Sequence, residues 1–180
     1  MPSPVGHAVA GVIVALASEK SARLRPRPTS SAILWTLLLV CAFLAALPDI
    51  DYIYPEYHRG PTHSISAVVM VTLIAAGVTR LITGSFAWRV AAVCGLAYFS
   101  HIVMDWLGED PTATPGVMAL WPMSDRLFIS GWDWFRSTWR IDPLAPLNFV
   151  HNAKTLAQEL ILLGPILFWL LWRRAKTIAR

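Results

Sequence analysis

Long apolar segments alternate with short polar ones along this chain. The apolar segments lie near residues 4–18, 31–47, 65–83, 86–107 and 156–172. A helix of about 20 apolar residues crosses a hydrocarbon core roughly 30 Å thick. The first segment is shorter, because about 15 residues at roughly 1.5 Å each reach only about 22 Å. The pattern predicts an all-α integral membrane helical bundle of about five spans.

The composition favours the same class. Hydrophobic residues make up 56% of the 180 residues and charged residues only 14%, whereas a soluble domain has about 25% charged residues. The mean hydropathy is +0.52. No connection between the apolar segments is long enough to bury a core of its own, so we expect a single domain over residues 1–180. The longest loop, residues 108–154, is rich in Pro and Trp, and we expect it to carry function or to cover a site.

The net charge of +4 does not indicate a nucleic-acid partner, because the basic residues flank the apolar segments. Three basic clusters would share one side of the membrane, which their excess of Lys and Arg identifies as the cytoplasm. This assignment puts the N-terminus outside and the C-terminus inside. The clusters are Lys20, Arg23, Arg25 and Arg27, then Arg80 and Arg89, then Arg173, Arg174, Lys176 and Arg180, whereas Arg59, Arg126, Arg136, Arg140 and Lys154 fall on the other side.

Two features of the apolar segments have simple interpretations. The first segment has the length of a signal peptide, but Lys and Arg are absent before it and abundant after it, so we expect it to be retained. Cys41 and Cys94 stand alone in two apolar segments without C-x-x-C spacing. We expect both to be buried packing residues, and neither a disulfide framework nor a thiolate metal site is indicated.

Seven ionisable residues gather at the outer end of the predicted bundle. His7 opens the first span, Asp49 and Asp51 close the second, His58 and His63 precede the third, and His101 and Asp105 close the fourth. Burying such groups at the ends of membrane helices costs free energy unless partners offset it. A divalent cation is the simplest partner that all of them could share.

The local spacings suit metal binding. His101 and Asp105 are four residues apart, so a helix would place them on one face. Asp49 and Asp51 follow Pro48, where a helix is expected to end and both carboxylates can turn inward. A pair on one helix face can bind one ion, or can provide one ligand and the partner that orients it.

The segment H-R-G-P-T-H-S at residues 58–64 combines a chain break with candidate catalytic groups. Its Gly and Pro precede a helix that Thr62 or Ser64 can cap. His58 can be a metal ligand, a general acid or a solvated loop residue. Arg59 can contact a phosphate bidentately or pair with the neighbouring carboxylates.

These residues make up the expected site. Nitrogen and oxygen ligands without thiolate suit zinc, and also Mn or Fe. The candidates exceed the needs of one ion, so either two ions are bound or some candidates orient the ligands of one. The alternative is a buried hydrogen-bonded network without metal. The expected metal ligands are His7, Asp49, Asp51, His63, His101 and Asp105, and the expected catalytic residues are His58, Arg59 and Asp51.

Indole rings are concentrated in the long loop. Trp106, Trp121, Trp132, Trp134 and Trp139 flank or fill it, together with Phe128 and Phe135. Indoles favour the headgroup region of a bilayer. The loop can therefore be a plain interfacial anchor, or a lid that lies on the bilayer and admits lipid headgroups to the site.

The motifs occur in a recognisable order: G-H-A-V-A-G, L-P-D-I-D, H-R-G-P-T-H-S, S-H-I-V-M-D and L-W-P. In this order the chain resembles the YdjM-like family of inner-membrane, metal-dependent hydrolases, and H-R-G-x-T-H-S is the most specific part. The resemblance implies a membrane-embedded hydrolase of a bacterium or archaeon. It also implies that His7, Asp49, Asp51, His58, His63, His101 and Asp105 occupy the polar motif positions of the family. The pattern is more distantly similar to zinc-dependent phospholipase C and P1-type nucleases. Those enzymes are soluble and use three zinc ions, so their metal count does not transfer to this chain.

We therefore expect a metal-dependent hydrolase of phosphoester bonds, acting on lipid or lipid-linked substrates at the outer face of the cytoplasmic membrane. Membrane lipids are the expected partners, without nucleic acid. One alternative is a metal-ion or proton-coupled transporter or binding protein, which would need polar residues that continue to the cytoplasmic end. The other is a non-enzymatic scaffold whose polar cluster only fixes helix packing.

Overall fold

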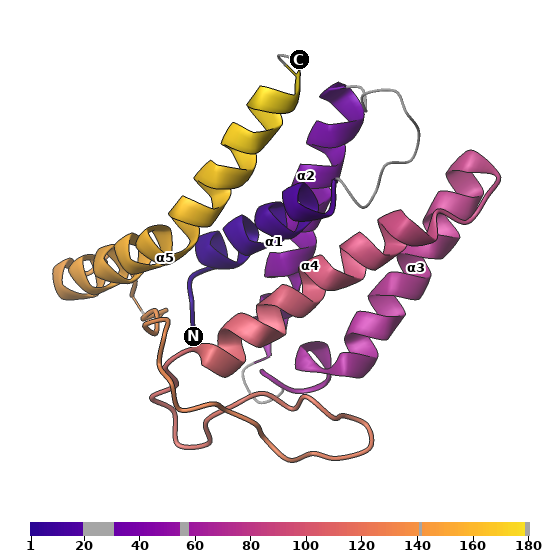
Figure 1. The fold of residues 1–180 in the computed structure, drawn as a ribbon. Coiled ribbons are helices and arrows are strands. Elements are labelled where there is room, and N and C mark those ends of the chain that lie inside the picture. Colours follow the sequence, from indigo (N-terminus) through magenta and orange to yellow (C-terminus); the bar gives the residue numbers. More distant parts are fainter. Residues whose placement is uncertain (20–30, 55–57, 141, 179–180) are drawn as a thin grey trace.

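The computed structural model describes residues 1–19, 31–54, 58–140 and 142–178. The basic linker expected at residues 20–30 lies outside these residues. The described chain is helical and contains no strand, only two isolated bridges. Its helices are α1 (Pro4–Ser18), α2 (Ser31–Ala46), α3 (Ile65–Thr83), α4 (Trp88–Leu107) and α5 (Pro146–Ile178), with 3-10 turns η1 (Leu47–Ile53) and η3 (Pro61–His63) between α2 and α3 (Figure 1).

Within the described residues, four helices are long and apolar enough to cross a membrane. They are Ala32–Ile53, Ile65–Thr83, Trp88–Leu107 and Pro146–Thr177, and α1 is a shorter apolar helix. Large apolar side chains also cover the outside of the bundle: Leu81 is 86% exposed and Phe168 70% exposed. Such a surface is suited to lipid and not to water. The prediction of an all-α membrane bundle is confirmed, with four long helices and a shorter first one.

The short helix α1 lies inside the bundle and packs against α2, α4 and α5, while α3 packs against α4. Ala15, Cys41 and Ala97 are completely buried where α1, α2 and α4 meet. The approach of α1 to α2 depends on Gly11, because a Cβ atom there would collide with the backbone carbonyl of Cys41. Cys41 and Cys94 are both buried and free, as predicted from their isolation in the sequence.

The helix ends fix where the polar residues lie. Ser3 caps α1 by accepting a hydrogen bond from the N–H of Gly6 at 3.0 Å. Ser64 caps α3 and accepts from the N–H of Ala67 at 3.2 Å, so one of the two predicted caps is confirmed. Beyond Ala46, α2 continues as the 3-10 turn η1, which carries L-P-D-I-D.

Helix α5 begins earlier than the hydropathy pattern indicates, at Pro146 and not near residue 156. Proline suits the first position of a helix because its fixed φ is already helical. The first turns are polar and bind the preceding loop: Asn152 exchanges hydrogen bonds of 2.8 and 2.9 Å with the backbone of Trp139. Pro165 lies inside α5, and an internal proline bends a helix. Figure 1 shows α5 as two arms that point in different directions.

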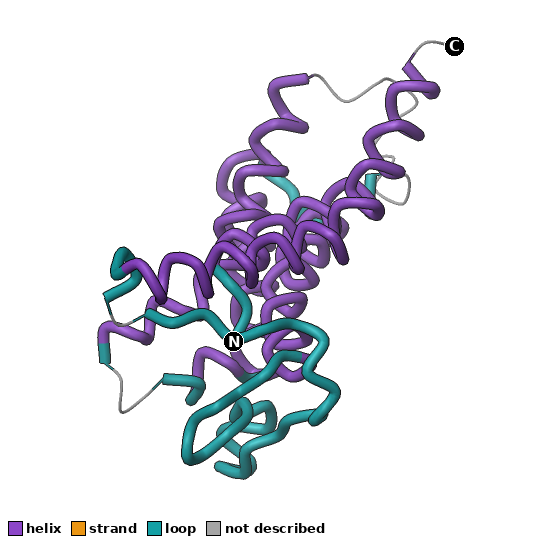
Figure 2. The backbone as a smooth tube through the Cα atoms, turned by 90° about the vertical axis from the view of Figure 1, so that its left-hand side faces the viewer, coloured by secondary structure: helices purple, strands orange, loops and turns teal. Residues whose placement is uncertain are grey.

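The long loop joins α4 to α5 and covers one end of the bundle; here it comprises residues 108–145 apart from 141 (Figure 2). It is tied to the short segments beside it. The N–H of Ile65 donates to Ala119 at 2.9 Å, and the N–H of Met118 donates to the carbonyl of Arg59 at 3.0 Å. The start of α1, both 3-10 turns and the end of α4 meet under this loop, so the fold collects the polar motifs at one end.

Candidate metal centre and adjoining pocket

Two helices contribute the most deeply buried part of the centre. His101 and Asp105 lie one turn apart on α4, with Nε2 of His101 3.2 Å from Oδ2 of Asp105, which confirms that they share one face. His7 enters from α1, and its Nε2 lies 3.3 Å from Oδ1 of Asp105. The rings of His7 and His101 stack with their centroids 3.7 Å apart. A single carboxylate therefore faces imidazoles from two helices.

His63 reaches the same place from the 3-10 turn η3. Its Nε2 lies 3.3 Å from Oδ2 of Asp105 and 3.0 Å from Nε2 of His101. The Nδ1 atom of His101 faces the carbonyl oxygen of Ala45 at 2.7 Å, so this nitrogen must donate the hydrogen bond. A neutral imidazole that donates from Nδ1 has its lone pair on Nε2. In that form the Nε2 lone pair of His101 lies beside Asp105 and His63, where it can serve as a metal ligand.

Asp49 and Asp51 turn inward from η1, but to different positions. Oδ1 of Asp49 lies 3.9 Å from Nε2 of His101, while its Oδ2 accepts a hydrogen bond from Arg140 at 2.8 Å. Asp51 contacts imidazole rings with both oxygens: Oδ1 lies 2.6 Å from Nδ1 of His58, and Oδ2 lies 3.2 Å from Nδ1 of His63. Asp49 thus points into the centre, whereas Asp51 orients two of its histidines.

Several buried atoms of the centre lack a hydrogen-bond partner. Within the described residues these are both ring nitrogens of His7, Oδ1 of Asp49 and both oxygens of Asp105. The side chains of His7, His63 and His101 are completely buried. An unsatisfied buried polar group costs about 1–3 kcal/mol, and a charged one costs more. Five such atoms in one cluster are therefore available as ligands for a cation.

The ligand atoms are close enough together for metal binding. One set is His7, His101 and Asp105, and another is Asp49, His63 and His101; in each set the atoms lie within 4.8 Å of one another. His101 belongs to both sets, so the cluster has room for one ion or for two neighbouring ions. The donors are nitrogen and oxygen alone, which fits zinc, manganese or iron.

Electrostatics favour positive charge at this place. Burial by itself lowers the pKa of His63, but the adjacent carboxylates of Asp105 and Asp51 outweigh burial and raise the pKa to about 9. Three carboxylates converge here, and among the described residues only Arg140 forms an ion pair with one of them through a guanidinium. The fit to a divalent cation is therefore one of charge as well as of ligand type.

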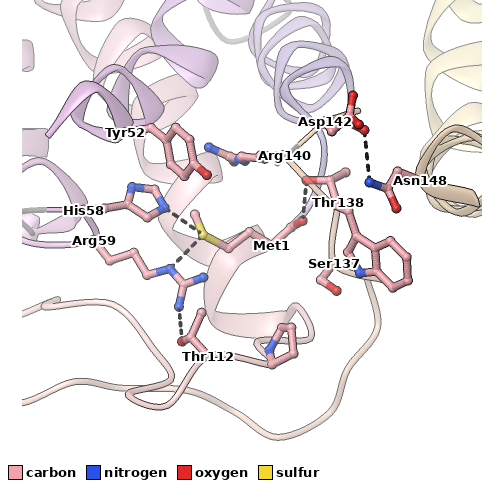
Figure 3. Close-up of a pocket in the computed structure, with 12 residues that line it drawn as sticks. Met1, Tyr52, His58, Arg59, Thr112, Ser137, Thr138, Arg140, Asp142 and Asn148 are labelled. Carbon is pink, nitrogen blue, oxygen red and sulfur yellow. Dashed lines mark hydrogen bonds between the residues drawn. The ribbon is translucent and has the colours of Figure 1, made fainter. Parts of the chain in front are cut away.

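A pocket of about 420 Å³ opens beside the centre, and His58 and Arg59 lie at its edge (Figure 3). The sequence left two partners open for Arg59. Its guanidinium pairs with Asp110 of the long loop and donates to Thr112 at 3.1 Å, and only its backbone N–H contacts Asp51, at 3.2 Å. Arg59 has φ 67°, in the left-handed region, and its side chain lines the pocket.

The family model described as YdjM inner membrane protein matches residues 1–177. The chain belongs to this family. The family description and the four apolar helices indicate a protein of the inner membrane. No curated protein and no solved structure shows significant similarity to the chain. The likeness to zinc-dependent phospholipase C and P1-type nucleases accordingly stays an expectation from sequence.

The structure adds residues that the sequence pattern did not single out for this YdjM family site. Arg140 pairs with Asp49, and Asp110 pairs with Arg59. Both lie in the long loop, where no periodicity indicates which side chains meet. Glu159 of α5 is buried and binds Ser3 at the start of α1. The sequence does indicate Glu159 as a residue of interest, because a lone carboxylate within an apolar segment is costly without a partner.

Four tryptophans of the long loop and its edge fall into two groups. Trp139 lines the pocket, and its ring stacks on His151 with a centroid distance of 4.1 Å. Trp106, Trp132 and Trp134 form an exposed row, with neighbouring ring centroids 6.1 and 5.4 Å apart. The exposed row has the character of an interfacial anchor. Trp139 is the indole that a bound molecule in the pocket would meet.

Proposed function

We propose that this chain is a membrane-embedded, metal-dependent hydrolase that cleaves phosphoester bonds in lipid or lipid-linked substrates. The observation that carries the proposal is the set of buried, unpartnered ligand atoms on His7, Asp49 and Asp105, which face the lone pair of His101. A structural network would satisfy its own hydrogen bonds. These atoms are left for an ion.

Each part of the site has a defined task in this proposal. His7, Asp49, His63, His101 and Asp105 would hold one or two divalent ions, with zinc the first choice and manganese or iron the alternatives. A bound ion there would lower the pKa of a coordinated water and neutralise charge on a phosphoryl oxygen. The carboxylates of Asp51 and Asp105 set the orientation of the imidazoles between them.

His58 has the geometry of a proton donor or acceptor. Asp51 holds its Nδ1 at 2.6 Å, so its Nε2 faces the pocket. A carboxylate that fixes one ring nitrogen leaves the other free to exchange a proton with a substrate. In hydrolysis, water adds across the P–O bond, and the leaving oxygen needs a proton. Nε2 of His58 is placed to supply it.

The side of the membrane follows from the distribution of basic residues. The centre lies at the end of the bundle that carries the long loop, and the turn between α3 and α4, with Arg80 and Arg89, lies at the opposite end. Lys and Arg accumulate on the cytoplasmic side of membrane proteins. We therefore place the site at the extracytoplasmic face, where headgroups of the outer leaflet can reach it.

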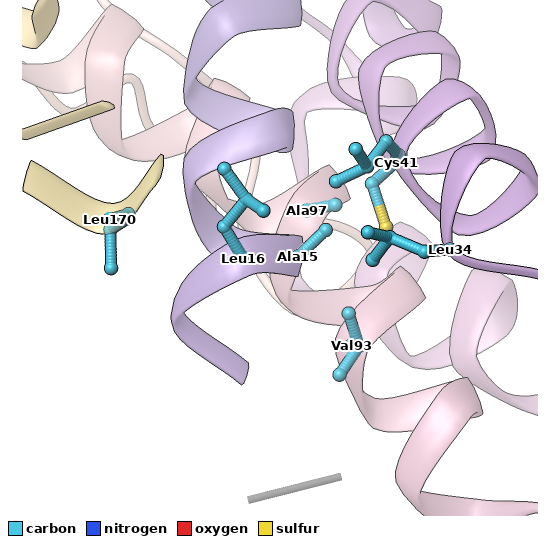
Figure 4. Close-up of a cluster of buried hydrophobic side chains, with 8 residues drawn as sticks. Ala15, Leu16, Leu34, Cys41, Val93, Ala97 and Leu170 are labelled. Atoms are coloured by element: carbon cyan, nitrogen blue, oxygen red, sulfur yellow. The ribbon is translucent and has the colours of Figure 1, made fainter. Parts of the chain in front are cut away.

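A transporter is less consistent with the interior. Away from the polar end, the space between α1, α2, α4 and α5 is filled by apolar side chains, among them Leu16, Leu34, Val93 and Leu170 (Figure 4). A transport path would need polar groups or water along this region. The packed apolar interior suits a site that opens to one face only.

Metal analysis of the detergent-purified chain tests the proposal. Stoichiometric zinc, manganese or iron is expected in the unmodified chain and not in the variant His101→Ala, Asp105→Ala. The matched control is His151→Ala, Asp125→Ala, which removes the same residue types outside the centre and should keep the metal. Hydrolysis of phospholipids and generic phosphoesters should follow the metal. Absence of metal from all three proteins would contradict the proposed metal site. Bound metal without any hydrolysis would contradict the proposed hydrolase activity.

A further inference from the structure

The pocket beside the metal centre has the charge of an anion site. Its lining includes Arg59 and Arg140, the ring of His58 and the hydroxyls of Thr112 and Thr138, against a single carboxylate, that of Asp142. Figure 3 shows these side chains around a common space, with the side chain of Met1 extending into it. Its volume of about 420 Å³ is in the range of small-molecule sites.

Two nitrogen atoms in this pocket, one of them on a guanidinium, converge on a weak acceptor. Nε2 of His58 lies 3.2 Å and Nε of Arg59 lies 2.7 Å from the sulfur of Met1. A thioether sulfur accepts hydrogen bonds poorly, whereas an anionic oxygen forms charge-assisted bonds with the same donors. A methionine side chain has three flexible torsions and can move aside at little cost. The point occupied by the sulfur is thus suited to an oxyanion.

The second guanidinium is fixed in place by the metal centre itself. Arg140 donates to Oδ2 of Asp49 at 2.8 Å, and its guanidinium lies 4.9 Å from the ring centroid of Tyr52. Asp49 is also a candidate metal ligand, so Arg140 holds the pocket directly against the centre. On the other side, Asp110 and Thr112 hold Arg59. Ion pairs that fix a guanidinium from behind lower the entropic cost of binding a ligand in front.

We propose that this pocket binds the phosphate group of the substrate, with His58, Arg59 and Arg140 as the groups that contact its oxygens. The inference rests on the proposed hydrolase activity, because the pocket would hold the phosphoester that the neighbouring centre cleaves. Guanidinium groups match phosphate oxygens in charge and in geometry. The phosphate can belong to a lipid headgroup or to a water-soluble ester, and the two sources are separated by experiment.

Binding can be measured without turnover. The full chain in detergent, kept in EDTA so that the probe stays intact, is titrated with dioleoyl phosphatidic acid and followed by native mass spectrometry. Dioleoylglycerol is the probe without phosphate. Glycerol 3-phosphate and inorganic phosphate are then added as soluble competitors. Preferential binding of phosphatidic acid with weak competition identifies a lipid headgroup, and strong competition by glycerol 3-phosphate identifies a soluble ester.

Four variants decide whether the arginines are responsible. Arg140→Gln, and Arg59→Gln combined with Asp110→Asn, should each weaken the binding of the phosphate probe by about tenfold or more. Replacing Asp110 together with Arg59 avoids leaving an unpaired carboxylate at position 110, which would destabilise the fold. Arg126→Gln removes the same charge from the long loop outside the pocket and should bind as the unmodified chain does. Arg140→Lys keeps the charge and is expected to fall between these results.

The outcomes separate the two proposals. Equal binding by all arginine variants, or equal binding of dioleoylglycerol and phosphatidic acid, would overturn the phosphate pocket and leave the metal and hydrolysis results untouched. Arginine-dependent phosphate binding, by a chain that contained no metal when purified without EDTA, would support the pocket and refute the hydrolase.

Discussion

Glu159 shows how one carboxylate in an apolar helix can position a candidate metal ligand, His7, on a second helix. It is almost completely buried in α5 and accepts hydrogen bonds from the backbone N–H and the hydroxyl of Ser3. Ser3 caps α1, and His7 follows in the first turn of that helix. Gly6 leaves the space that the carboxylate fills. Glu159 therefore fixes the end of α1 that carries a candidate metal ligand.

We expect Glu159→Ala to lower the free energy of unfolding by about 1–3 kcal/mol, because the N–H of Ser3 would stay buried without an acceptor. We also expect weaker metal binding, since the start of α1 would lose its anchor. Thermal unfolding in detergent and a metal titration measure the two effects. Lys154→Ala, at an exposed position of the same helix, is the matched control. Unchanged metal affinity in Glu159→Ala would show that Glu159 stabilises α5 without positioning His7.

At the scale of single residues, the sequence predicts side chains whose chemistry is costly in a membrane. His7, His63, His101 and Asp105 could be recognised because each stands at the end of an apolar segment. Arg140 could not, because its contact with Asp49 joins residues 91 positions apart through an irregular loop. Spacing on a helix predicts neighbours, but no comparable rule predicts which residues of a long loop will meet a distant turn.

At the scale of elements, the bounds of α3 and of the short helix α1 could be predicted, and those of α5 could not. Hydropathy detects the part of a helix that faces lipid or the core. The first turns of α5 contact the long loop through polar side chains such as His151 and Asn152, so they have no apolar signal. Asp51 is an expected ligand and an expected catalytic residue, and its position in η1 brings its two oxygens beside His58 and His63. A sequence pattern of two aspartates does not reveal those contacts.

The packing of α1 against α2 depends on Gly11 and can be tested at that position. A side chain there would collide with the backbone of α2 at Cys41, and backbone cannot move aside easily. We expect Gly11→Val to lower the free energy of unfolding by about 1–3 kcal/mol or more, as overpacked cores do. Detergent-solubilised protein should unfold at a lower temperature and bind metal more weakly, because α1 also carries His7.

Gly77→Val is the matched control for Gly11→Val. Gly77 lies in α3, and nothing stands within 4 Å of the place of its Cβ atom. The same substitution there should leave both the unfolding temperature and metal binding close to those of the unmodified chain. Equal effects at the two positions would mean that loss of a helical glycine matters and that the contact between α1 and α2 does not.

At the scale of the whole molecule, fold and candidate function depend on the same constraint. A short chain in a membrane can gather many polar groups most easily where helices end, and here the ends of α1, η1, η3 and α4 meet under one loop. The apolar segments predict the helices, and the shared end of the motifs predicts the cluster. The pocket could not be predicted, because the long loop supplies much of its lining and folds without a regular pattern.

The orientation of this bundle would decide which leaflet supplies the proposed substrate, and two cysteine variants can determine it. Asp125 and Ser85 are exposed. The long loop, which carries Asp125, and the turn between α3 and α4, which carries Ser85, lie at opposite ends of the bundle (Figure 1). Cys41 and Cys94 are buried, so the unmodified chain should give little background labelling. With intact cells, a membrane-impermeant maleimide should label Asp125→Cys at once and Ser85→Cys only after the membrane is opened. This result follows from the cluster of Arg80 and Arg89 beside Ser85, since translocating basic residues is unfavourable. The reverse pattern would place the metal centre in the cytoplasm and would assign its substrate to the inner leaflet.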